Sequence, residues 1–202
     1  LVGSEMCIRD SALTGRTNPF SLLFHSLAYV LNKIHLFQHE SLAMPATNSG
    51  KVRIIGGQWK RTNIPVLNAD GLRPTGDRQR ETLFNWLSFL LGDFEGRSAL
   101  DMFGGSGALS FEFLSRGGSR AVLCEMNRRA AQFIKQTAEK LDAEGLTIIV
   151  GNSLTDPRVS ELSPYDLAFI DPPFAADLQL KALKRCVPML ASDGLIYVES
   201  PQ

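Results

Sequence analysis

The chain has 202 residues, of which 44% are hydrophobic and 21% are charged, a balance typical of one soluble globular domain. Cys7, Cys124 and Cys186 lie far apart without a C-x-x-C pair, which argues against a disulfide framework and a cysteine zinc site and favours a reducing, cytoplasmic setting. All three histidines fall within the first forty residues, so an enzyme in the rest of the chain would work without a histidine base or metal ligand.

The formal net charge of zero conceals an uneven distribution of charge along the chain. Residues 51–80 carry seven basic and two acidic groups, whereas residues 81–202 carry eleven basic and sixteen acidic groups. A basic segment beside an acidic body is the asymmetry that a nucleic-acid-facing arm gives, although an ordinary solvated face is the alternative.

Three regions are expected from the N-terminal end onwards. Residues 1–43 open with LVGSEMCIRDS, which looks like translated adapter sequence, and their apolar stretch is too polar and too short for a membrane span. A signal-peptide core or an appended helix are the alternatives there. We therefore expect residues 1–43 to be an extension outside the fold, residues 44–71 to form a basic arm, and residues 72–202 to form the main domain.

The arm and the segment after it carry clear local signals. KVRIIGGQWKRTNIPV contains two short β-prone runs around Gly56 and Gly57, which predicts a hairpin or a bulged ribbon. LRPTGDRQRETLFNWLSFLL has helix-start residues between 74 and 77, an apolar stripe at helical spacing between 83 and 91, and Gly92 at its end. This pattern predicts one amphipathic helix.

The remaining sequence alternates strand and helix signals. Helical patterns begin at Ala108, Arg128 and Asp177, and strands are expected at 98–103, 120–125, 146–150, 165–170 and 194–199. Repeated β-then-α units predict an α/β fold with a doubly wound parallel sheet that is covered by helices on both faces. In such a sheet, ligands bind outside the carboxyl ends of the strands.

The first of these strands leads into a glycine-rich turn with Gly104, Gly105 and Gly107. Glycines there allow a tight turn and let backbone N–H groups approach a ligand at the start of a helix, although a plain tight turn is the alternative. Asp101 precedes the turn, where its carboxylate would repel a pyrophosphate and attract an ammonium or sulfonium cation. The combination favours S-adenosylmethionine over NAD, unless Asp101 is only a capping or solvated residue.

Two further residues at strand ends are expected to bind the cofactor. Glu125 ends the second strand about twenty residues after the glycine turn, the spacing at which an acid accepts hydrogen bonds from ribose hydroxyls. Asn152 follows the third strand, where its amide could meet an adenine edge or simply occupy an ordinary turn.

The fourth strand ends in Asp171, Pro172, Pro173 and Phe174. The two prolines fix φ and remove two backbone donors, which leaves a rigid run of acceptors beside an aromatic ring. Such a site suits an amino group on a flat ring, because the acceptors bind its N–H groups and the phenylalanine stacks on the base. A structural strand end followed by prolines is the alternative.

With these motifs the chain resembles the amino-methyltransferases, in which an [N/D/S]-P-P-[Y/F/W] motif holds the accepting nitrogen. Within them it is most similar to the RsmD family, bacterial 16S ribosomal RNA guanine-N2-methyltransferases. The resemblance covers about Val52 to Ser200 and rests on VRIIGGQWK, GLRPTGDRQRETLFNWL, LDMFGGSGALSFE, CEMN, FIDPPF and LIYVES.

The resemblance implies the Rossmann-like fold of class I methyltransferases and transfer of a methyl group from S-adenosylmethionine to N2 of a guanine. It assigns Asp101 and the glycines to the methionine end of the cofactor, Glu125 to ribose and Asn152 to adenine. It also assigns residues 171–174 to the base as the catalytic segment, with Asp171 bordering the cofactor as well. RNA would be contacted by Arg53, Trp59, Lys60, Arg61, Arg73, Thr75, Arg78 and Arg80.

The resemblance also sets the expected partners. The partner is 16S ribosomal RNA or an assembling small subunit, and we expect a monomer in the cytoplasm that uses no metal and no membrane. The family chain continues for two strands beyond the fifth strand, so that strand's outer edge is expected to be exposed.

Three other functions stay open at the level of the sequence. A methyltransferase could act instead on adenine N6 of nucleic acid or on a protein glutamine amide. The chain could also be an NAD-dependent oxidoreductase, which Asp101 and the proline pair disfavour. Finally, it could be an RNA-binding module without catalytic activity.

Overall fold

Strands and helices alternate along the part of the chain that the computed structural model describes, namely residues 35–40, 50–66, 76–172 and 176–200. In chain order the elements are β1 (His35–Glu40), β2 (Lys51–Arg53), β3 (Asn63–Pro65), α2 (Asp77–Leu91), β4 (Ser98–Asp101), α3 (Ala108–Ser115), β5 (Arg120–Glu125), α4 (Arg128–Leu141), β6 (Leu146–Val150), α5 (Pro157–Glu161), β7 (Tyr165–Ile170), α6 (Ala176–Cys186), a short 3-10 helix (Val187–Met189) and β8 (Leu190–Ser200).

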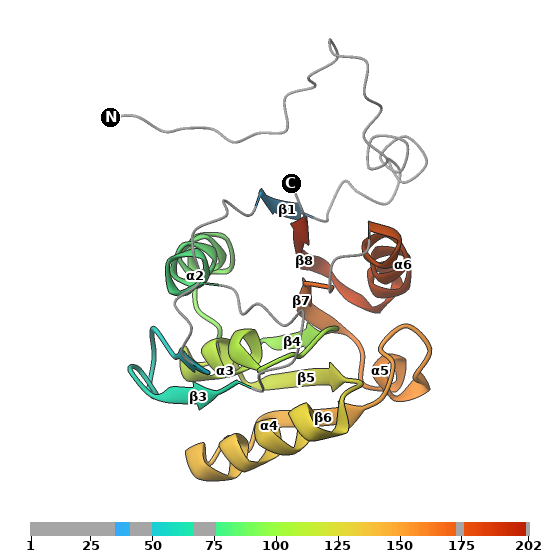
Figure 1. The fold of residues 1–202 in the computed structure, drawn as a ribbon. Helices are drawn as coiled ribbons and strands as arrows, with labels where there is room; N and C mark the ends of the chain where they lie inside the picture. Colours follow the sequence, from blue (N-terminus) through green and yellow to red (C-terminus); the bar gives the residue numbers. More distant parts are fainter. Residues whose placement is uncertain (1–34, 41–49, 67–75, 173–175, 201–202) are drawn as a thin grey trace, which may run out of the picture. The chain divides into compact units, whose positions relative to one another are not determined.

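One parallel sheet organises these elements, with the strand order β1-β8-β7-β4-β5-β6 (Figure 1). The chain runs outward from β4 through β5 to β6 and then returns to the other side of β4 as β7. The strand order therefore reverses between β4 and β7, which is the switch point where doubly wound sheets bind ligands. The expected doubly wound fold is confirmed.

The boundaries of most elements agree with the sequence. β5, β6 and β7 have the predicted bounds, and β2 pairs with β3 as the antiparallel hairpin of the arm. The helix α2 begins at Asp77, and Gly92 ends it with a φ of +78° and an N–H donated to the Ser88 carbonyl at 3.0 Å. A glycine is suited to this position because it has no Cβ to oppose a positive φ.

The outer edge of β8 differs from the expectation that it would be exposed. β1 pairs with it in parallel, with His35 opposite Leu195 and Glu40 opposite Ser200. The N-terminal extension therefore contributes a strand from within the range expected to lie outside the fold. An unpaired edge presents a row of backbone N–H and C=O groups, and the pairing with β1 satisfies them along this edge of β8.

Helices cover the two faces of the sheet with different parts of the chain. On one face α2 and α3 bury a cluster that includes Phe84, Leu87, Phe113, Phe169 and Tyr197. The arm joins the same face, because its buried isoleucines contact Phe111 of α3, Leu123 of β5 and Ile134 of α4. The alternate strand residues point to the other face, where α5 and α6 lie (Figure 1).

Candidate active site

The glycine turn and the Asp171–Pro172 segment lie next to each other at the switch point. β4 and β7 are hydrogen-bonded neighbours, with Asp101 opposite Phe169, and the Met102 N–H donates to the Phe169 carbonyl at 3.1 Å. Asp171 follows two residues after Phe169 along the chain. The two motifs that the sequence singled out on separate strands therefore share one edge of the sheet.

The backbone of the glycine turn passes too close to β5 for larger residues. A Cβ on Gly104 would lie 2.4 Å from Leu123 Cδ2 and 3.1 Å from the Cys124 carbonyl oxygen. Gly107 has a φ of +77° and precedes the first residue of α3, which it caps without a side chain. Glycine is needed at both positions, and the turn brings backbone N–H groups to the start of a helix.

Asp101 is buried, with 3% of its surface exposed. Its carboxylate accepts hydrogen bonds from the Ser110 hydroxyl at 2.9 Å and from the Phe103 N–H at 3.4 Å. Burial raises the pKa of Asp101 to about 6, with a smaller contribution from the charge of Glu125, while its two hydrogen bonds lower the pKa. Two carboxylates therefore act on the same small region, which suits a cationic ligand and disfavours a pyrophosphate.

Glu125 binds the glycine turn directly. One of its oxygens accepts a hydrogen bond from the Gly105 N–H and the other from the Asn127 N–H, both at 2.7 Å. Asn127 in turn caps α4 by accepting from Arg129 and Ala130. The carboxylate at the end of β5 thus holds two loops in place at the predicted ribose position.

Asn152 lies beside Glu125, because the Gly151 N–H donates to the Glu125 carbonyl at 3.0 Å. Its side-chain oxygen accepts a hydrogen bond from the Leu154 N–H at 3.0 Å, in an Asx turn. Since this contact occupies the oxygen, the amide nitrogen is the group best placed to bind a ligand, as a donor.

The end of β7 adjoins the end of β8, with Ile170 opposite Val198. Asp171 is partly exposed and Pro172 is buried, while Pro173 and Phe174 lie outside the described residues. The Tyr197 hydroxyl is within 3.4 Å of a Glu199 oxygen. Burial raises the pKa of Tyr197 above its ordinary range, and the charges of Glu199 and Asp171 add to that effect. Sequence reasoning missed Tyr197 and Glu199, although LIYVES marks them as polar residues in an apolar strand.

The predicted RNA-contacting residues have different surroundings in the structure. Arg78 is exposed, and Arg73 and Thr75 lie outside the described residues. The expectation that Arg80 contributes to the positive surface is wrong, because only 1% of its surface is exposed. Its guanidinium donates to the Arg53 carbonyl at 2.6 Å and to Asp77 at 2.8 Å, so it joins the arm to α2.

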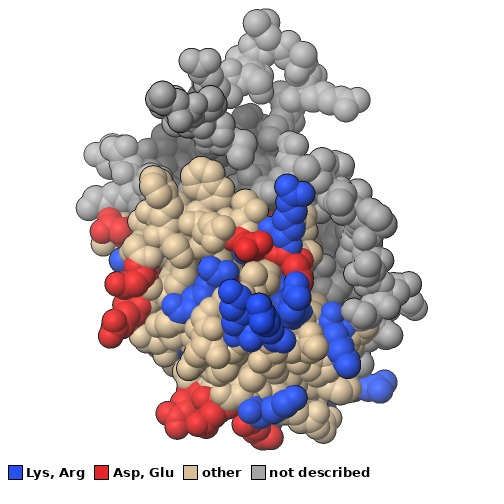
Figure 2. Space-filling model, turned by 90° about the vertical axis from the view of Figure 1, so that its left-hand side faces the viewer, with Lys and Arg blue, Asp and Glu red and all other residues tan. Residues whose placement is uncertain are grey.

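The arm presents its other cations to solvent. Arg53, Lys60 and Arg61 are exposed, and Figure 2 shows Lys and Arg side chains gathered on the side of the molecule that carries the arm and α2. Trp59 is only partly exposed and its ring packs on Phe111, with centroids 6.4 Å apart and planes at 74°. The indole therefore contributes to the packing of the arm, and its predicted stacking on a base stays a prediction.

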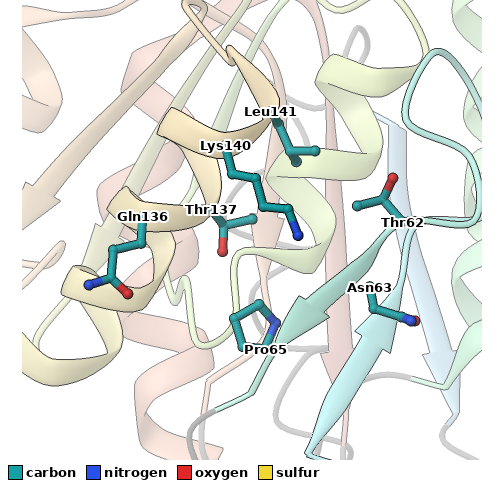
Figure 3. A pocket seen from close by; sticks show the side chains of 7 residues that line it. All are labelled: Thr62, Asn63, Pro65, Gln136, Thr137, Lys140 and Leu141. Carbon is teal, nitrogen blue, oxygen red and sulfur yellow. The ribbon is translucent and has the colours of Figure 1, made fainter.

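A shallow pocket of about 210 Å³ lies between β3 and α4, and its lining contains no residue from the carboxyl ends of the parallel strands. In Figure 3 the Lys140 side chain extends from α4 towards Thr62 and Asn63 of the arm, with Pro65 and Thr137 beside it. None of the residues predicted to bind cofactor lines this pocket. It belongs to the junction between the arm and α4.

The described residues give no support for a metal site or for a membrane-spanning helix. They contain no group of three or more histidine, cysteine or acidic side chains placed to hold a metal ion. Among the helices in the described ranges, none has the length and apolar character to cross a membrane.

Comparison with known proteins gives a consistent set of relatives. The family described as "Conserved hypothetical protein 95" matches residues 52–202. The chain is 40% identical over 156 residues to Ribosomal RNA small subunit methyltransferase D of Escherichia coli, covering 76% of this chain and 77% of the relative. The protein of the same name from Haemophilus influenzae is also 40% identical over 156 residues, covering 75% of this chain and 79% of that one.

A solved structure supports the same relationship. The structure described as "Putative methyltransferase yhhF from Escherichia coli" superposes with a TM-score of 0.65 at 40% identity, covering 74% of this chain and 80% of that one. The glycine turn, the acid at the end of β5 and the Asp-Pro-Pro-Phe segment all fall within the matched range. The chain therefore belongs to the RsmD family of methyltransferases and has the class I methyltransferase fold.

Proposed function

We propose that this enzyme transfers a methyl group from S-adenosylmethionine to the exocyclic N2 of a guanine in 16S ribosomal RNA. The observation that carries the proposal is the adjacency of the glycine turn and Asp171 at the switch point, in a chain of this family. Since β4 and β7 are direct neighbours, a donor on the turn and an acceptor base at Asp171 would be close enough to react.

The residues around the glycine turn fit S-adenosylmethionine. Gly104 lets the turn pass against β5, where a Cβ would meet the Leu123 side chain, and the N–H groups at the start of α3 are available to a carboxylate. Asp101 and Glu125 supply negative charge for the cationic groups, Glu125 would accept from ribose hydroxyls, and Asn152 would donate to adenine. When bound, this cofactor supplies a methyl group carried on a sulfonium.

Asp171 and the Pro172 carbonyl would hold the base. Guanine presents N1–H and N2–H₂ as adjacent donors, which a carboxylate matches, whereas adenine presents a donor beside an acceptor. The Asp171 carboxylate would also stabilise positive charge that develops on N2. By the family resemblance Pro173 and Phe174 complete this site, with the phenylalanine ring on the base.

The substrate base must leave its helix to reach a crevice at a sheet edge, so we expect it to be unpaired or flipped out. The exposed cations of the arm and of α2 would bind the phosphates around it (Figure 2). Ribosomal RNA as substrate places the protein in the cytoplasm, where we expect it to act as a monomer without a metal.

Mass spectrometry of nucleosides tests this proposal directly. Small-subunit RNA from cells lacking the enzyme, free or within subunits, is incubated with methyl-labelled S-adenosylmethionine and then digested. We expect labelled N2-methylguanosine from the wild-type protein and none from Asp171→Ala, while the exposed Asp193→Ala control retains the activity. Label on adenine N6, or on protein only, would replace the proposal with the corresponding alternative.

A further inference from the structure

A buried carboxylate fixes the arm to α3. Glu112 is 0% exposed, and its oxygens accept hydrogen bonds from the backbone N–H groups of Ile55 at 2.7 Å and Gly56 at 2.8 Å. The same carboxylate pairs with Arg116 at 2.7 Å. Hydrogen bonds to an ionised acceptor are the stronger kind, and a buried acid with several of them has little freedom to move.

Ser115 continues this attachment at the end of the helix. Its hydroxyl donates to the Gly56 carbonyl at 2.6 Å and accepts from the Trp59 N–H at 2.9 Å, and its own carbonyl accepts from the Gln58 N–H at 2.8 Å. Gly57 has a φ of +75°, and a Cβ there would lie 1.7 Å from the Ser115 carbonyl oxygen. The loop is therefore closely fitted to the helix through its backbone.

The attachment determines where the positive charge of the arm lies. β2 and β3 have three residues each, and a two-stranded hairpin of this size is only marginally stable without a packing partner. Lys60 and Arg61 directly follow the bonded segment and are exposed. The bonds to α3 therefore hold the loop that leads directly into these two cations, in addition to the packing of the buried isoleucines of the arm.

The helix that carries Glu112 also carries the glycine turn at its other end. α3 begins after Gly107 and runs to Ser115, so its eight residues span about 12 Å. Lys60 and Arg61 thus lie towards the far end of α3 from the cofactor turn. Arg53, elsewhere on the arm, pairs with Asp77 at the start of α2 at 3.0 Å.

We propose that Glu112 is a positioning residue that sets the distance between the phosphates held by Lys60 and Arg61 and the base that enters the site at Asp171. Phosphate contacts fix the register of a nucleic acid without reading its sequence, so a rigid arm would choose which nucleotide reaches the site. This inference rests on the proposed function and adds a residue that determines substrate position.

Glu112→Gln tests the attachment with minimal change in volume. One oxygen becomes an NH₂ group, which would face the donors of Ile55, Gly56 or Arg116 and could accept from none of them. We expect the KM for small-subunit RNA to rise about tenfold, with kcat and the Kd for S-adenosylmethionine changed by less than about twofold. Methylation at guanines other than the wild-type site should appear in the nucleoside map.

Gly57→Ala provides an independent route to the same outcome. It changes no residue of α3 and keeps the Glu112 carboxylate, and it displaces the loop from the helix through the contact with the Ser115 carbonyl. We expect the same selective loss of RNA affinity and of site fidelity, together with faster hydrogen exchange at Ile55 and Gly56. Glu139→Gln, an exposed acid on α4, is the matched control and should behave as wild type.

The outcomes separate this inference from the proposed function. If the wild-type protein places no methyl group on ribosomal RNA, the proposed function fails regardless of the variants. Suppose that the wild type is active and that Glu112→Gln and Gly57→Ala both show faster hydrogen exchange at the Ile55 and Gly56 amides. If the KM for RNA and the methylated position are then unchanged, the positioning role is wrong. A loss of cofactor binding and of melting temperature in parallel with RNA binding would indicate a purely structural role and would equally overturn the inference.

Discussion

The hydroxyl of Ser110 on α3 donates a hydrogen bond of 2.9 Å to the buried carboxylate of Asp101 at the end of β4. This bond joins the helix after the glycine turn to the strand before it. It also lowers the pKa of Asp101, against the larger effect of burial that raises it to about 6. Asp101 therefore changes its charge within an experimentally accessible pH range.

The pKa of Asp101 predicts how stability depends on pH. Its value in the folded chain, about 6, exceeds the ordinary 3.8, so the folded chain binds the proton more tightly than the unfolded chain. The stability contributed by protonation is fully present below about pH 4 and is lost as the pH rises through 6. We expect Asp101→Asn to raise the free energy of unfolding at pH 8 by up to about 3 kcal/mol.

Urea unfolding of both proteins between pH 4 and pH 8 measures this difference. Ser110→Ala serves as a companion variant, since losing its hydrogen bond should move the pH dependence to higher pH. Parallel curves for wild type and Asp101→Asn across this range would contradict the assignment.

Cofactor affinity should depend on the same carboxyl in the opposite direction. A cationic donor prefers the ionised form of Asp101, so its Kd should increase by up to about tenfold between pH 7.5 and pH 5. Isothermal titration calorimetry with S-adenosylmethionine measures the change. The thioether product, which lacks the sulfonium charge and keeps the ammonium group, shows which of the two cations responds to Asp101. Asp101→Asn should bind the donor more weakly and with much less dependence on pH. A Kd that is constant over this pH range in the wild type would refute the role of Asp101.

Gly104 offers a test of the turn that does not depend on charge. Its Cβ would lie 2.4 Å from the Leu123 side chain, and the nearby Cys124 carbonyl leaves little room for adjustment. We expect Gly104→Ala to reduce the free energy of unfolding by about 1 to 3 kcal/mol and to weaken cofactor binding. Gly76→Ala is the control, because its Cβ would be 3.4 Å from the Gln79 side chain and its φ is negative. Equal stability of the two variants, measured by thermal melting, would show that the turn adapts.

Two arginines of the basic segment should give opposite phenotypes. Arg80→Ala removes a buried guanidinium with partners in the arm and in α2, so we expect a loss of about 2 to 4 kcal/mol in stability. Arg53→Ala removes an exposed cation, so we expect little loss of stability. The slope of the logarithm of the RNA binding constant against the logarithm of the salt concentration should decrease in magnitude by about one. Chemical denaturation and RNA titrations at several salt concentrations separate the two. If Arg80→Ala kept its stability and lowered only the salt dependence of RNA binding, the buried position of Arg80 would be contradicted.

Several features of this fold follow from local sequence patterns. β5, β6 and β7 were predicted at their observed bounds because an apolar run between helix signals has few other solutions in a parallel sheet. The carboxyl ends of parallel strands lie at one edge of the sheet, so the sequence also predicted that Asp101 and Asp171 share that edge. The order of the strands, with β4 and β7 as direct neighbours, was not predicted and comes from the structure.

Other features depend on contacts that a local pattern does not contain. Arg80 was expected at the surface, although it precedes Leu83, Phe84 and Leu87 by three, four and seven residues and so lies on the buried stripe of α2. That spacing was available as a signal. The pairing of β1 is a contact with a strand whose paired residues lie 160 positions further along the chain, which a local pattern does not contain. Glu112 is an acid in a helix that is otherwise apolar or small on every side, which indicates buried partners without naming them.

The two hydrogen bonds of Glu125 have a consequence for the kinetics of ligand capture. Because its oxygens hold the Gly105 and Asn127 amides, this side of the candidate site is fixed by contacts within the chain itself. Binding of a nucleoside here does not require the loops of Gly105 and Asn127 to become ordered. The conformational entropy of these loops was lost when the chain folded, so it does not reduce the binding affinity. Association at this side of the site should then be limited by diffusion and orientation, with differences among donor analogues expressed mainly in how long each remains bound.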